Sequence, residues 1–162
     1  MLFRSGGGDN AKHFTLTGLH NSWPEAIVVY MQALERTPGR GDTGFQNSDM
    51  NRDNRDLKFF DTVFSDVRKK YSVDDRRIFG VGFSNGARFL FVLWAARPKV
   101  FAAFAPVAGS LAPALQLKEP KPMMQIGSPS DGSVNYKSQM DAVEVAKKLN
   151  FADGQGEPCG QN

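Results

Sequence analysis

The sequence predicts an α/β protein with a mostly parallel sheet and helices on both faces. Three observations predict this class. Strand and helix signals alternate along the 162 residues, residues 26–30 form a continuous apolar run, and residues 77–94 combine a buried strand, a glycine-bracketed serine and a buried helix. A strand that is apolar without alternation is typical of a sheet covered on both faces. We expect one domain over residues 1–162, with no internal repeat.

The composition is that of an ordinary globular domain. Apolar residues make up 41% and charged residues 23%, which excludes a disordered or collagen-like chain. No apolar run approaches the roughly 20 residues that a membrane helix needs. The net charge of +3 is spread along the chain and forms no basic block. We therefore expect a soluble protein whose partners are neither nucleic acid nor membrane.

A single cysteine, Cys159, excludes a disulfide within the chain. This fits a reduced cytosolic protein, and it also fits a secreted protein whose partner cysteine lies outside these residues. No secretory signal is visible at the N-terminus. The sequence starts in what reads as the end of a strand, so we expect it to lack its beginning.

The first element is a short apolar piece, Leu2-Phe3, that runs into a loop with three glycines at residues 6–8. Glycines let backbone N–H groups approach a ligand. In serine hydrolases the loop after an early strand supplies one donor of the oxyanion hole. The alternative interpretation is a flexible end or a cloning remnant.

Further elements follow before the glycine-bracketed serine. Residues 10–18 read as a short helix or loop, in the region that holds the two histidines, His13 and His20. A strand is expected at 26–30 and a surface loop at 37–44. An amphipathic helix is predicted from Asn54 or Asp56 to Tyr71, because apolar residues recur at helical spacing and basic residues fill the last turn.

The central motif is Gly82-Phe83-Ser84-Asn85-Gly86, which has the G-x-S-x-G form of a nucleophile elbow. In such a turn the serine hydroxyl projects from the sheet, and a side chain at either glycine would meet neighbouring backbone. The helix that follows is apolar nearly all round and ends before Pro98, so it must be buried. An ordinary Gly-Ser-Gly turn in an α/β protein is the alternative.

Beyond the motif the sequence predicts two more strands and a helix. The strands are expected at residues 100–107 and 123–126, separated by an irregular stretch at 111–122 with three prolines. An amphipathic helix is expected at 138–149, with Asn150 ending it. The loop at 127–133 after the last strand contains Asp131.

Asp131 fits the acid of a catalytic triad. An activated serine needs a base and the base needs an orienting acid, and in α/β-hydrolases the order is Ser, Asp or Glu, His. The acid belongs at the carboxyl tip of a later strand, where Asp131 is expected. Ser130-Asp131-Gly132 is also good turn chemistry, so a plain turn residue is the alternative.

The sequence resembles the polyhydroxybutyrate depolymerase and feruloyl esterase-like branch of the α/β-hydrolase family. The resemblance rests on residues 23–30, on the run from 55 to 86, and on the Asp131 loop with Val134 and Tyr136 behind it. It implies a partial hydrolase fold that lacks the first strands and the last strand and helix. The implied site residues are nucleophile Ser84, acid Asp131, oxyanion donors Asn85 and Gly6 or its neighbour, and Phe45 and Phe83 as candidates to line the substrate cleft.

The sequence departs from the family pattern at four places. Arg4-Ser5 stand where the family has His-Gly, Gly44-Phe45-Gln46 replaces Gly-Trp-Gln, and Gly127-Ser128 replaces a second His-Gly. No histidine follows Asp131. The first departure leaves the identity of the second oxyanion donor open. The last means that no histidine occupies the position that the family pattern gives to the catalytic base.

The resemblance implies a secreted serine esterase that needs no metal or organic cofactor and acts on a small or polymeric ester. The implied substrates are hydroxyalkanoate oligomers or aryl esters of plant polysaccharide. Without its histidine the chain alone would be weak or inactive. Two other readings stay open, a non-catalytic hydrolase-like binding protein and an inactive fragment. A base supplied by His13 or His20 would require an unusual route.

Overall fold

Four parallel strands form the sheet, in the order β2-β1-β3-β4. The computed structural model describes residues 11–48 and 53–151 and the backbone of residues 2–5. The strands are β1 (Leu2–Ser5), β2 (Tyr30–Gln32), β3 (Phe79–Ser84) and β4 (Ala103–Val107). Because every ladder is parallel, the carboxyl ends of all strands meet at one edge of the sheet.

A fifth extended segment, residues 123–126, lies along the outer edge of β4. It pairs in parallel through the bridges Phe104↔Met123 and Val107↔Ile126. The Met124 N–H donates to the Phe104 carbonyl at 2.9 Å, and the Ile126 N–H donates to the Pro106 carbonyl at 3.0 Å. The strand predicted at residues 123–126 therefore lies where it was expected, but it pairs with β4 only through two isolated parallel bridges.

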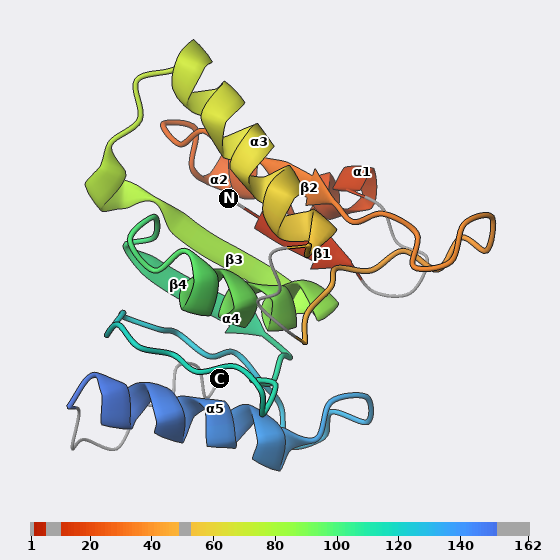
Figure 1. Cartoon of the computed structure of the whole chain (residues 1–162), viewed down its shortest axis with the longest axis vertical. Helices are drawn as coiled ribbons and strands as arrows, with labels where there is room; N and C mark the ends of the chain where they lie inside the picture. The colour runs from red at the N-terminus through yellow and green to blue at the C-terminus, as the bar shows by residue number, and fades with distance from the viewer. Residues whose placement is uncertain (1, 6–10, 49–52, 152–162) are drawn as a thin grey trace.

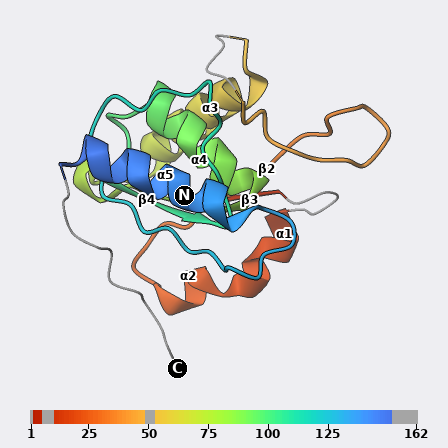
Figure 2. The ribbon, with the colours of Figure 1, turned by 90° about the horizontal axis from the view of Figure 1, so that it is seen from below.

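Helices cover both faces of the sheet, as predicted. Figure 2 shows α1 (Ala11–Phe14) and α2 (Leu19–Ser22) on one side and α3 (Arg55–Lys70) and α4 (Asn85–Ala96) on the other. Helix α5 (Tyr136–Leu149) runs beyond the 123–126 segment (Figure 1). Two short 3-10 helices, η1 (Thr15–Thr17) and η2 (Asp75–Arg77), lie in the connections.

Helix α4 is the centre of the core. Its apolar run is buried on nearly every side, which explains the absence of a polar face in its sequence. Trp94 stacks on Phe104 of β4 with ring centroids 5.1 Å apart, and its indole N–H donates to the Glu119 carbonyl at 2.8 Å. Helix α5 adds Ala142 and Ala146 to the same core.

Helix α3 begins at a capping asparagine. The Asn54 side-chain oxygen accepts from the backbone N–H groups of Asp56 and Leu57, at 3.0 and 3.1 Å. The last turn carries Arg68, Lys69 and Lys70, which suit the negative end of the helix dipole. The prediction of this helix is confirmed.

Several predicted boundaries are wrong by two or more residues. The strand predicted at 26–30 begins only at Tyr30, which is the residue opposite Leu2 of β1, and the Ala26 N–H instead closes a turn onto the Trp23 carbonyl. The strand predicted from residue 100 begins at Ala103. Helix α5 begins at Tyr136, two residues early, because Asn135 caps it.

We expect Gly109→Ala to destabilise the fold. A Cβ atom at position 109 would lie 2.3 Å from the Cβ of Ala87, a buried residue of α4. Overpacking of this kind costs about 1–3 kcal/mol. Gly132→Ala is the matched control, because nothing lies within 4 Å of its Cβ, and its effect should stay within about 0.5 kcal/mol. Urea unfolding measures both, and equal stability of the two variants would contradict the packing described here.

Candidate active site

Ser84 ends strand β3 and immediately precedes α4, at the carboxyl edge of the sheet. Its backbone has φ 52° and ψ −116°, a region that non-glycine residues rarely occupy. Such a conformation costs about 1–3 kcal/mol and persists only where its surroundings impose it. A Cβ at Gly82 would lie 2.6 Å from the Gly86 carbonyl oxygen, so the turn requires glycine there. We call this strained strand-to-helix turn at residues 82–86 the elbow.

Asn85 uses its side chain to hold a distant loop. Its Oδ1 accepts from the Phe45 N–H at 2.7 Å, and its Nδ2 donates to the Phe45 carbonyl at 3.1 Å. The residue is buried, so this two-point contact satisfies groups that water does not reach. As the first residue of α4, Asn85 has its backbone N–H at the helix start, where N–H groups point away from the helix toward anions.

Phe45 does not line an open cleft. Its side chain is 2% exposed and stacks on Phe89 of α4 at a centroid distance of 4.8 Å. The expectation of a substrate-lining role is therefore corrected, since Asn85 draws the Phe45 backbone inward and the ring follows into the core. Phe83, by contrast, is 37% exposed beside Ser84. Gly6 lies outside the described residues.

The loop that carries Phe45 is also fixed from the start of α3. The Gln46 N–H donates to Asp56 Oδ2 at 2.7 Å, its carbonyl accepts from Asn54 Nδ2 at 3.1 Å, and its Oε1 accepts from the Arg55 N–H at 2.7 Å. Asp56 is 1% exposed. Residues 45 and 46 are thus held from α4 and from α3, which fixes the surroundings of the elbow.

Asp131 lies in the loop after the 123–126 segment, at the same edge of the sheet as Ser84. Its Oδ1 accepts from the N–H groups of Ser133 and Val134, at 2.8 and 3.0 Å, and its Oδ2 accepts from Gln139 Nε2 at 3.2 Å. The Val134 N–H, followed by that of Ser133, holds the pKa of the Asp131 carboxyl below its usual range. Asp131 is accordingly ionised at neutral pH.

Ser84 ends strand β3, and Asp131 follows the 123–126 segment. Strand β4 lies between β3 and this segment. Because β3, β4 and the 123–126 segment run in parallel, Ser84 and Asp131 share one edge of the sheet, with β4 between the strands that precede them.

The two histidines of the chain lie in the connection between β1 and β2. His20 Nδ1 is 2.7 Å from the Tyr30 hydroxyl, and the two rings meet edge to face. Tyr30, the first residue of β2, is level with Val81 of β3, because both residues pair with Leu2 of β1. Val81 precedes Ser84 by three residues. His20 thus lies toward the amino end of the sheet and is not beside Ser84. His13 is exposed on α1.

Comparisons with known proteins agree with this architecture. No family model matches the sequence. A bifunctional acetylxylan esterase/xylanase of Neocallimastix patriciarum is 28% identical over 98 residues, which are 60% of this chain. The chain spans only 14% of the length of that relative.

The solved structures extend the likeness to most of the chain. The Bacillus cereus carboxylesterase has a TM-score of 0.69 at 18% identity, over 92% of this chain and 73% of that protein. A variant of Arabidopsis thaliana SOBER1 gives 0.64 at 15% identity, over 92% and 83%. A thermostable esterase has a TM-score of 0.53 at 19% identity, over 59% of this chain and 26% of that protein. The chain has an α/β-hydrolase fold. The predicted fold class is confirmed.

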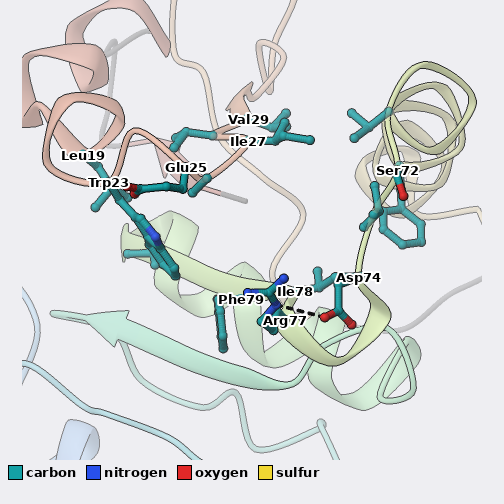
Figure 3. Close-up of a pocket in the computed structure, with 16 residues that line it drawn as sticks. Leu19, Trp23, Glu25, Ile27, Val29, Ser72, Asp74, Arg77, Ile78 and Phe79 are labelled. Atoms are coloured by element: carbon teal, nitrogen blue, oxygen red, sulfur yellow. Dashed lines mark hydrogen bonds and ion pairs between the residues drawn. The ribbon is translucent and has the colours of Figure 1, made fainter.

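A cavity of about 250 Å³ lies away from the serine of this hydrolase fold. Figure 3 shows Trp23, Ile27 and Val29 on one side of it and Phe79 on another, with the ion pair between Arg77 and Asp74 at its rim. Phe79 is the first residue of β3, whereas Ser84 is the last. The cavity therefore belongs to the amino end of the sheet, and neither Ser84 nor Asp131 lines it.

The described part of the hydrolase fold offers neither a metal site nor a membrane span. No cluster of three histidine, cysteine or acidic residues with the geometry to hold a metal ion occurs among the described residues. No helix in this part of the chain combines the length and apolarity needed to cross a bilayer.

We expect Ser84→Gly to be more stable than Ser84→Ala. Both variants lose the hydroxyl, but glycine alone relieves the positive φ, and the difference should be on the order of 1 kcal/mol after the entropy of glycine is subtracted. Arg88, inside α4, provides the control. There Arg88→Ala should be more stable than Arg88→Gly by about 1 kcal/mol. Urea unfolding of the four variants tests this, and a more stable Ser84→Ala than Ser84→Gly would show that the turn is not strained.

Proposed function

We propose that this protein is a carboxylic-ester hydrolase in which Ser84 is the nucleophile. The observation that carries the proposal is the strained serine between a buried strand and a buried helix. A protein keeps a backbone of this cost chiefly where it serves a function. The esterases among the similar proteins support the same chemistry.

In the proposed reaction the Ser84 Oγ attacks the ester carbonyl while a base takes its proton. The negative charge that forms on the carbonyl oxygen is stabilised by the Asn85 N–H at the start of α4 and by a donor from the loop after β1, for which Gly6 is the candidate. The base then protonates the departing alcohol, and water releases the acyl group from Ser84. The reaction requires no metal or organic cofactor.

Asp131 is the proposed orienting acid of this reaction. Its ionised carboxylate lies at the same edge of the sheet as Ser84, and in the proposed reaction it stabilises the protonated base without accepting its proton. We propose that the base is a histidine other than His13 and His20. No histidine follows Asp131, and His20 already contacts Tyr30. Residues 1–162 alone then hydrolyse esters weakly.

The proposed substrates are esters of hydroxyalkanoates or aryl esters of polysaccharide, both from the family resemblance. The relative named as an acetylxylan esterase supports a polysaccharide ester. Secretion is proposed on the same resemblance. A hydrolase-like protein that binds esters without cleaving them is the second candidate.

We expect residues 1–162 to hydrolyse a short p-nitrophenyl ester at a rate barely above background, with little change in Ser84→Ala. A serine hydroxyl without a placed base is a weak nucleophile, and triad members act as a unit. Steady-state assays that include His13→Ala and His20→Ala measure this. Brisk turnover that is abolished by Ser84→Ala and by one histidine substitution would show that the base is already present.

A histidine-supplied form, in which residues 1–162 are followed by a segment that carries a histidine, tests the acid. In this form we expect Asp131→Asn to lower kcat by orders of magnitude, comparable with the ~10⁴-fold loss when a triad acid is neutralised. Asp141→Asn is the control, because Asp141 is an exposed partner of Lys137 on α5. Activity that ignores Asp131→Asn, or that depends on added Zn²⁺ or Ca²⁺, would contradict the assignment.

A further inference from the structure

Gln139 is a fully buried polar side chain that the proposed reaction does not use. It lies in α5 and is 0% exposed. A buried amide must be hydrogen-bonded to avoid a large desolvation cost. Its Nε2 donates to Asp131 Oδ2 at 3.2 Å and to the Val134 carbonyl at 2.9 Å, while its Oε1 faces Gln125 Nε2 at 3.4 Å.

These partners fix the orientation of the amide. Nε2 faces two groups that only accept, a carboxylate and a carbonyl, whereas Oε1 faces a donor. A flipped amide would place its oxygen against two acceptor oxygens. The loop also comes close to the amide, since a Cβ at Gly127 would lie 2.3 Å from Gln139 Oε1. Any larger residue at position 127 would displace the amide.

The hydrogen bonds of Asp131 leave one direction open. Oδ1 accepts from two backbone N–H groups, those of Ser133 and Val134, and Oδ2 accepts from Gln139. A carboxylate offers about four acceptor sites, two on each oxygen. The remaining site is therefore on Oδ2, the oxygen that Gln139 holds.

We infer that Gln139 is a positioning residue of the proposed hydrolase, holding Asp131 so that Oδ2 is the oxygen that receives the N–H of the catalytic base. The inference rests on the proposed function for the role of Asp131. The contact itself is a property of residues 1–162. Gln125 connects this contact to the residues after β4, because its Nε2 donates both to Gln139 Oε1 at 3.4 Å and to the Gly109 carbonyl at 3.3 Å.

A glutamine that only packed the loop would act through the Val134 carbonyl and would leave the Asp131 charge unaffected. A donor aimed at Oδ2 instead favours the ionised carboxylate and lowers its pKa, so removing the donor raises that pKa. The titration of Asp131 therefore separates a positioning role from a packing role.

The test is carbon NMR of the Asp131 carboxyl in residues 1–162 as pH is lowered. In Gln139→Met we expect the titration midpoint of Asp131 to rise, because the variant removes a hydrogen-bond donor to the ionised carboxylate. Gln125→Met is the matched control, because it removes the donor to Gln139 Oε1 but keeps the bond to Asp131, and its midpoint should stay near that of the wild type. An unchanged midpoint in folded Gln139→Met would overturn the inference.

A second measurement needs no variant at position 139. In the wild-type chain the side-chain amide protons of Gln139 should shift with the same midpoint as the Asp131 carboxyl, whereas those of exposed Gln116 should not. Gln139 resonances that ignore the Asp131 titration would also overturn the inference. Neither readout involves hydrolysis, so failure here is distinguishable from failure of the proposed esterase, which the turnover of Asp131→Asn decides.

Discussion

The left-handed backbone of Ser84 is the constraint on which the rest of this structure depends. An L-residue at φ 52° costs energy that only its neighbours can offset. The neighbours do so by close packing against the start of α4. Gly82 lies against the Gly86 carbonyl, and Gly109 lies against Ala87. Asn85 adds two buried hydrogen bonds to Phe45. The turn is therefore imposed from three directions.

The elbow and helix α3 could be predicted from the sequence because both are local. The glycine spacing around Ser84 and the apolar period of residues 55–70 carry their own structural information. The start of β2 could not be predicted, because residues 26–29 have the composition of a strand and Tyr30 is set only by pairing with Leu2. The position of a ladder partner is a tertiary property.

The proposed reacting groups could be placed at one edge of the sheet from the sequence, but the residues that hold them in position could not. Ser84 ends one strand and Asp131 follows another, and the two strands run in parallel to β4 between them. Phe45 was misassigned because an aromatic residue in a polar loop gives no sign that the Asn85 amide holds its backbone inward. Gln139 carried no signal either, since a glutamine in an amphipathic helix reads as a surface residue until its burial is known.

Covalent labelling of Ser84 tests the central claim most directly. The histidine-supplied form is treated with a fluorophosphonate probe, which reacts with activated serines, and the adduct is mapped by mass spectrometry. The account predicts one adduct, on the peptide that contains Ser84, and its loss in Ser84→Ala. Labelling at a different serine, or labelling that survives Ser84→Ala, would contradict the account.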